Sequence, residues 1–124
     1  MYVLFFVLIS ICSHGFTLFF NSKNQLHTCY RKISLSAEAF ECEGQMCYKV
    51  ANPSGKIIQS GCYLRAQCEQ FFLQGDQCLG LADIREKLTS SNLEERKKAS
   101  AISLLNKFGM SGTLCCCSKN FCNK

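Results

Sequence analysis

The first hydrophobic segment lies at the N-terminus and carries no charge. Residues 2–11 are almost continuously apolar, and the first charged side chain is Lys23. After this apolar segment, Ser13 and Gly15 place small residues at the two positions that a signal peptidase recognises. We therefore predict a signal peptide over residues 1–15 and a domain over residues 16–124. The alternative is an uncleaved membrane anchor, because the uncharged stretch reaches about 20 residues, the length of a membrane-spanning helix.

A second segment mixes apolar and polar residues on both sides of a turn sequence. Residues 45–51 and 56–62 are rich in β-prone side chains, and residues 52–55, Asn-Pro-Ser-Gly, separate them. Proline presets φ at the second position of a turn, and glycine permits positive φ at its end. We therefore predict a β-hairpin. Its tip is a candidate binding site, formed by Lys49, Asn52, Pro53 and Lys56.

A third segment, residues 79–114, follows a helical pattern. Apolar residues recur every three or four positions in its second half. Ser91 and Glu94 fit a capping box at the start of this helix, Glu94 and Lys98 form a favourable pair four residues apart, and Gly109 marks its end. A shorter helix is predicted before it from the spacing of Leu81, Ile84 and Leu88.

The apolar stripe of the second helix allows two interpretations. Packing against the rest of the domain is the more common role of such a stripe. The alternative is a face that binds a partner or a membrane surface. The membrane is the less favoured of these, because the stripe is narrow and the opposite face carries both signs of charge. Its members are Leu93, Ala101, Ile102, Leu104, Leu105 and Phe108.

The cysteine content indicates that disulfides hold these elements together. Eleven of the 124 residues are cysteine, a proportion typical of small secreted domains. Removal of the signal peptide would take Cys12 and leave an even number of cysteines, which fits five bridges. The cysteine spacing alone does not fix which pairs form. We expect the product to be secreted and extracellular.

The net charge is moderately positive and gives no nucleic-acid signature. The 14 Lys and Arg residues outnumber the 9 Asp and Glu residues, for a formal net charge of +5. This charge is compatible with acidic partners or anionic surfaces and requires neither.

Residues for catalysis are sparse. The predicted mature chain has one histidine, His27, and a lone histidine beside a cysteine is usually a surface residue. An enzyme needs an acid, base or nucleophile held in one site, and zinc favours spaced cysteine pairs over three consecutive cysteines. We therefore expect neither an enzyme nor a metal site, and no cofactor. The carboxylates are scattered along the chain, at Glu38, Glu41, Glu43, Glu69 and Asp76.

The C-terminal cysteine cluster carries the most specific signal. Cys115-Cys116-Cys117 is followed by four residues and then Cys122-Asn123, which resembles the end of the three-finger superfamily. That superfamily includes snake toxins, Ly6 proteins and the ectodomains of transforming-growth-factor-beta receptors. The order of ten cysteines, with the local sequences Cys47-Tyr48 and Gly61-Cys62-Tyr63-Leu64, is similar to that of the activin type II receptor ectodomain. Residues 42–47 also resemble the nematode ET module.

The resemblance implies a small, disulfide-rich, mainly β three-finger fold with an α-helical insert in finger III, at about residues 79–114. Fingers I and II would span residues 29–42 and 47–62, and Asn123 would hydrogen-bond to backbone between fingers. The implied disulfides are Cys29–Cys47, Cys42–Cys62, Cys68–Cys116, Cys78–Cys115 and Cys117–Cys122.

The expected function is that of a secreted, non-enzymatic binding protein for an extracellular protein or receptor. A soluble, receptor-like modulator is favoured, because the chain stops at Lys124 where the receptors continue into a membrane helix and a kinase. The receptors' ligand contacts are not carried over to this chain. One alternative is a toxin-like ligand of a channel or receptor that uses the Lys49–Lys56 fingertip. Another is a membrane-active or antimicrobial effector that uses the helix over residues 92–108.

Overall fold

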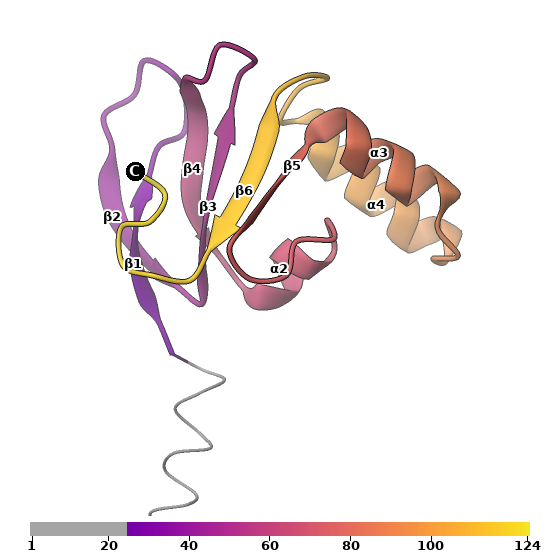
Figure 1. Ribbon diagram of the computed structural model, residues 1–124, viewed down its shortest axis with the longest axis horizontal. Coiled ribbons are helices and arrows are strands. Elements are labelled where there is room, and N and C mark those ends of the chain that lie inside the picture. The colour runs from indigo at the N-terminus through magenta and orange to yellow at the C-terminus, as the bar shows by residue number, and fades with distance from the viewer. Residues whose placement is uncertain (1–24) are drawn as a thin grey trace, which may run out of the picture.

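The computed structural model describes residues 25–124, which form a small, mainly β domain with two antiparallel sheets and three helices (Figure 1). The predicted signal peptide, residues 1–15, and Cys12 lie outside the described residues. Strands β1 and β2 form one sheet, and the other has the strand order β4-β3-β6-β5. The strands are β1 (His27–Arg31), β2 (Phe40–Gly44), β3 (Met46–Ala51), β4 (Ile57–Tyr63), β5 (Gln77–Gly80) and β6 (Thr113–Cys117), and the helices are α2 (Arg65–Glu69), α3 (Leu81–Ser90) and α4 (Glu95–Asn106).

The predicted hairpin is confirmed as strands β3 and β4. Met46 pairs with Tyr63 at its base, and a bulge between Val50 and Ala51 lets Ile57 pair with Ala51 near its tip. The Gly55 backbone N–H donates to the Asn52 carbonyl oxygen, and Gly55 takes a φ of 87°, as the turn sequence requires.

Strand β6 explains how three consecutive cysteines can bridge to different parts of the chain. Successive side chains of a strand point to opposite faces of the sheet. Cys116 therefore faces the side on which α2 lies, while Cys115 and Cys117 face the other side. β6 runs between β3 and β5, where Cys117 pairs with Cys47 in register and Cys115 pairs with Cys78.

Five disulfides connect the two sheets, helix α2 and the C-terminal segment, so the prediction of five bridges is confirmed. Each stabilises a small domain by roughly 2–4 kcal/mol, mainly by restricting the unfolded chain. These pairs are the same as those that the family resemblance implies. They are Cys29–Cys47, Cys42–Cys62, Cys68–Cys116, Cys78–Cys115 and Cys117–Cys122.

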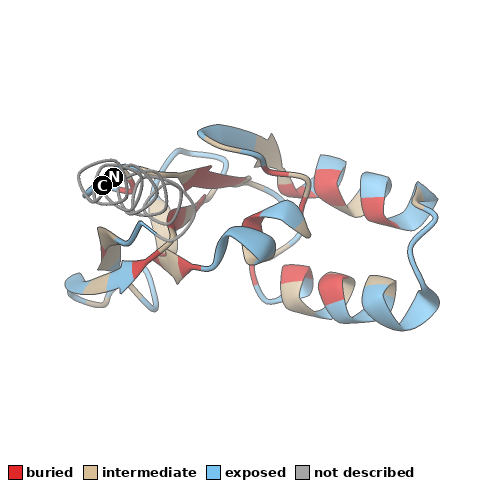
Figure 2. Cartoon of the chain, turned by 90° about the horizontal axis from the view of Figure 1, so that it is seen from below, coloured by how far each residue is buried: buried red, intermediate tan, exposed pale blue. Residues whose placement is uncertain are grey.

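The main core lies between one face of the four-stranded sheet and the helices. Both predicted helices exist, and most of the predicted apolar stripe packs into this core. Leu93 does not, because it precedes α4 and is 41% exposed. Ala101, Leu105 and Phe108 are buried, while Ile102 and Leu104 are partly buried against them. Figure 2 shows that α3 and α4 each keep an exposed outer side. Within residues 25–124, no helix is long and apolar enough to cross a membrane.

The predicted capping box of the second helix is wrong. Helix α4 begins at Glu95, and no side chain caps it. Ser91 instead closes the preceding helix, because its hydroxyl donates to the Leu88 carbonyl oxygen at 2.7 Å. The predicted Glu94–Lys98 ion pair is also replaced, since the Lys98 ammonium lies 3.7 Å from the Glu95 carboxylate. Helix α3 extends to Ser90, so Ser91, which was predicted to begin the second helix, instead caps the end of the first.

Candidate interaction surface

The hairpin tip is built largely by one of its predicted binding residues. The side-chain oxygen of Asn52 accepts hydrogen bonds from the Ser54 backbone N–H, the Ser54 hydroxyl and the Lys56 backbone N–H, at 3.1, 2.8 and 3.0 Å. Asn52 therefore shapes the turn. Pro53 and Lys56 are exposed at the tip, where a partner can reach them.

Lys49, the fourth predicted binding residue, stands apart from the tip. It lies within β3 and is half-buried. Its register partners are Ser60 on β4 and Cys115 on β6, and residues directly opposite in an antiparallel sheet share a face. The structure thus places Lys49 on the face opposite the main core.

A loop beside the hairpin was not predicted as a binding element. Residues 32–39 connect β1 to β2, and Ile33 and Leu35 within it are 66% and 51% exposed. The loop is fixed to the hairpin at its start, because Lys32 and Ser60 exchange two backbone hydrogen bonds of 3.0 and 2.9 Å. The alternation of Ile33 and Leu35 with serines was the available signal, but the same pattern also fits a strand.

A depression of about 280 Å³ separates this loop from the hairpin. Tyr30, Ala39 and Ile57 give it an apolar lining, and Lys32 and Lys124 add two cations. Ser60 and Asn123, which are 3% and 1% exposed, line its most buried part. The site thus combines elements from β1, β4 and the C-terminal end.

Asn123 holds these elements together. Its side-chain oxygen accepts from the Tyr30 backbone N–H at 3.0 Å. Its amide nitrogen lies within hydrogen-bonding distance of three backbone carbonyl oxygens, those of Tyr30, Tyr48 and Gly61, at 2.8, 3.0 and 3.3 Å. One side chain therefore connects β1, β3 and β4.

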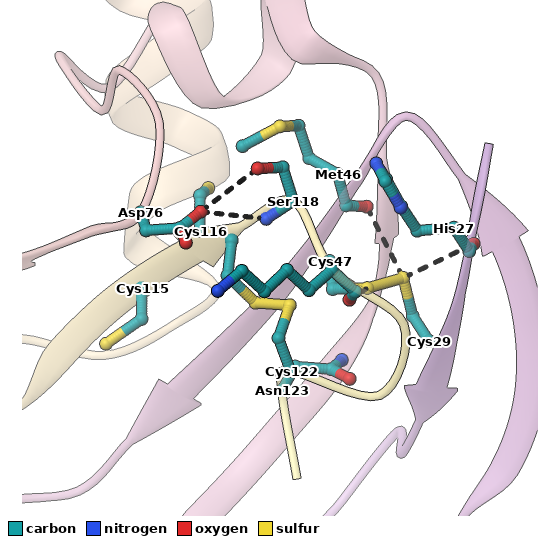
Figure 3. The surroundings of a disulfide bond; sticks show 12 residues. His27, Cys29, Met46, Cys47, Asp76, Cys115, Cys116, Ser118, Cys122 and Asn123 are labelled. Atoms are coloured by element: carbon teal, nitrogen blue, oxygen red, sulfur yellow. Dashed lines mark hydrogen bonds between the residues drawn. A yellow bond between two sulfur atoms is a disulfide. The ribbon is translucent and has the colours of Figure 1, made fainter. Parts of the chain in front are cut away.

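The segment that carries Asn123 is itself pinned at several points (Figure 3). The Cys117–Cys122 disulfide closes it into a short loop. At its start, the Asp76 carboxylate accepts from the backbone N–H and the hydroxyl of Ser118, at 2.9 and 3.1 Å. The role of Asp76 in this arrangement is to orient the loop.

The lone histidine and the other carboxylates weighed in the sequence analysis are spread over the domain. His27 lies in β1, Glu41 and Glu43 in β2, and Glu69 in α2, while Glu38 belongs to the loop of residues 32–39. Two core tyrosines of the described chain have shifted pKa values. Burial raises the pKa of Tyr48 and, together with the nearby Tyr48, that of Tyr63. The two rings stack with their centroids 3.9 Å apart.

Three cysteine sulfurs come close enough together to resemble a metal site. The Sγ atoms of Cys47, Cys117 and Cys122 lie within 4.8 Å of one another. All three are bonded in disulfides, Cys47 to Cys29 and the other two to each other. Metal ions bind the thiolate form of cysteine, so the oxidised cluster offers none of these ligands.

Comparisons of the chain with protein-family models, with curated proteins and with solved structures find no match. The candidate surface is therefore defined by its own geometry: the loop of residues 32–39, the hairpin tip and the depression between them.

Proposed function

We propose that this chain is a secreted, non-enzymatic, three-finger binding protein that recognises an extracellular protein, in the manner of a soluble receptor-like modulator. The observation that carries the proposal is the candidate surface itself. Two neighbouring loops carry the exposed side chains Ile33, Leu35 and Lys56, and the depression lies beside them. Five disulfides hold the scaffold beneath this surface. Exposed apolar side chains ringed by polar ones are typical of protein-binding sites.

Chain topology and the bridges support the three-finger interpretation. β1–β2 and β3–β4 are consecutive antiparallel pairs, and β5 and β6 form a third pair with α3 and α4 between them. Two disulfides join the first two pairs, and Asn123 links them through backbone contacts. A third disulfide, Cys78–Cys115, lies within the third pair, whose strand β6 pairs with β3. These features support the three-finger interpretation, which rests first on the order of the cysteines.

The fixed bases of the loops support the interpretation as a binding protein. Disulfides and backbone hydrogen bonds fix the bases of the loops, so their tips can vary in sequence without loss of the fold. A surface that is already ordered loses less conformational entropy on binding. The α4 helix does not favour the membrane-active alternative, because Ala101 and Leu105 are buried in the core.

The first test concerns secretion. The full chain is expressed in a secreting cell line, and the secreted product is analysed by N-terminal sequencing, thiol titration and disulfide mapping. We expect an N-terminus at Phe16, no free thiol and the five bridges described above. Retention in the cell membrane, or a free thiol, would contradict the proposal.

The second test concerns binding. The secreted protein is cross-linked in extracellular fluid from its source, alongside two variants with equal apolar losses. Ile33→Ser/Leu35→Ser alters the candidate surface, and Leu64→Ser/Leu93→Ser alters exposed positions elsewhere, at 57% and 41% exposure. We expect a cross-linked partner that the first variant loses and the second retains. Equal capture by both variants would place the binding site elsewhere.

A further inference from the structure

An aromatic pair adjoins the depression and is held in a strained conformation. The rings of Tyr30 and Phe121 lie 4.9 Å apart at 44°, and Phe121 is 37% exposed. Phe121 has a φ of 57°, in the left-handed region that a bulky L-residue rarely adopts. Such a conformation persists only where its surroundings enforce it, and it is often found at functional sites.

The enforcing contacts are visible on both sides of Phe121. Its backbone N–H donates to the Thr28 carbonyl oxygen at 2.7 Å, and the Thr28 N–H donates to the Asn120 side-chain oxygen at 3.0 Å. Cys122 and Asn123 follow directly and are fixed by the disulfide and by the contacts to Tyr30. The aromatic pair is thus a rigid, partly exposed shelf, the kind of group that dominates binding energy at protein interfaces.

The charged side chains beside this shelf are mostly lysines. Tyr30 also lines the depression, together with Lys32 and Lys124. Lys49 stands opposite Ser60 in register and adds a third cation, whereas Glu41, opposite Tyr30, is the facing carboxylate. Lys124, the last residue of the given chain, also carries an α-carboxylate, so three cations face two anions, and the small positive excess favours an acidic ligand group.

The size of the depression limits the ligand. Its volume of about 280 Å³ lies just below the ~300–1,000 Å³ of small-molecule pockets, so one side chain fits better than a whole small molecule. A polyanion such as a nucleic acid or a sulfated glycan would require a longer basic stripe than these three lysines provide.

We propose that Tyr30, Phe121 and the adjoining depression form the anchoring subsite for a peptide segment of the partner protein in which a large apolar side chain is flanked by carboxylates. The apolar side chain packs on the aromatic shelf and enters the depression. The carboxylates lie near Lys32 and Lys124. This inference rests on the proposed function and names the chemistry of the partner's contact segment.

The probe is the peptide acetyl-Glu-Phe-Glu-amide, titrated into the isotope-labelled secreted protein and followed by NMR. We expect saturable shifts at the amides of Tyr30, Lys32, Ser60 and Phe121. The neutral peptide acetyl-Gln-Phe-Gln-amide should bind roughly tenfold more weakly, because two exposed charge pairs are lost. Shifts confined to α3 and α4, or equal binding of the two peptides, would overturn the proposal.

Matched variants separate this subsite from a general charge effect. Lys32→Ser/Lys124→Ser should weaken the acidic peptide roughly tenfold, whereas Arg96→Ser/Lys97→Ser, with the same charge loss on the exposed side of α4, should leave binding unchanged. Phe121→Asn removes the ring with a residue that tolerates the left-handed conformation, and it should weaken both peptides equally. Unaltered binding by Phe121→Asn, with its disulfides intact, would also overturn the proposal.

A glycan competitor provides the last arm of the experiment. A heparin tetrasaccharide should not displace the peptide at physiological salt. If the tetrasaccharide displaces the peptide at a concentration below that of the peptide, the site prefers polyanions and the inference is overturned. The proposed function fails separately, when the protein is not secreted or when cross-linked capture does not depend on Ile33 and Leu35.

Discussion

The side-chain amide of Asn123 lies 3.0 Å from the carbonyl oxygen of Tyr48, a residue 75 positions earlier in the chain. Asn123 is 1% exposed, so water cannot replace its partners. Through this contact the C-terminal segment holds the middle of β3, and the same side chain also contacts β1 and β4. The C-terminal segment is therefore part of the scaffold as well as of the candidate surface.

Asn123→Ala should destabilise the fold by about 2–4 kcal/mol, because buried backbone groups of Tyr30, Tyr48 and Gly61 lose their partner without gaining water. Urea unfolding of the disulfide-intact protein measures this loss. The matched control is Asn120→Ala, which removes one exposed hydrogen bond to Thr28 and should cost about 1 kcal/mol or less. Equal losses in the two variants would mean that Asn123 has no special role in joining the strands.

Gly112 provides a second test of close packing, this time between backbones. Its φ is 109°, and a Cβ there would overlap the carbonyl oxygen of Ala51. Gly112→Ala should therefore cost more than about 3 kcal/mol, through strain and steric overlap together. Gly55, with a φ of 87°, has open space around its Cβ position. Gly55→Ala should cost only about 1 kcal/mol, because it introduces backbone strain without steric overlap. Thermal unfolding of the two variants therefore separates the cost of strain alone, at Gly55, from the cost of strain and overlap together, at Gly112.

The parts of the fold that the sequence predicted are those with local causes. The hairpin follows from the turn chemistry of residues 52–55, and the two helices follow from apolar spacing within each segment. The error at Ser91 is also local. Its hydroxyl could serve as the start of one helix or the end of another, and only the true length of α3 decides between them.

The candidate surface and the aromatic pair beside it were only partly predicted, because their residues are far apart in the sequence. Pro53 and Lys56 were identified from the turn, but Tyr30 and Phe121 come from opposite ends of the described chain. Phe121 gives no sequence signal of its left-handed conformation, which glycine or asparagine would have given. The exposure of Ile33 arises because no other element among residues 25–124 covers it, and a local pattern does not reveal this.

Leu105 tests whether the helical insert belongs to the core. It is fully buried, and Leu105→Ala should cost about 2–5 kcal/mol because it leaves a cavity between α4 and the sheet. Leu93→Ala, at a position 41% exposed just before α4, should cost no more than about 0.5 kcal/mol. Guanidinium unfolding of both variants provides the comparison. A small loss at Leu105 would indicate that α4 detaches readily and would revive its interpretation as a membrane-binding face.

Alkaline pH should destabilise the domain through Tyr63. Burial, and next the nearby Tyr48, raise the pKa of Tyr63 above its ordinary value of 10.0. The unfolded chain therefore loses this proton near pH 10, while the folded chain retains it. The stability from the neutral phenol is fully present below pH 10 and falls as the pH rises toward the folded pKa, by about 1.4 kcal/mol per pH unit.

The check is urea unfolding of the wild type and of Tyr63→Phe between pH 8 and pH 11, with short incubations that limit alkaline disulfide exchange. Phenylalanine keeps the ring that stacks on Tyr48 but has no proton to lose. We expect the variant to lose stability less steeply than the wild type above pH 10, by about 1.4 kcal/mol per pH unit. Parallel curves would show that Tyr63 ionises alike in the folded and unfolded chains, and its burial would then have no thermodynamic consequence for alkaline unfolding.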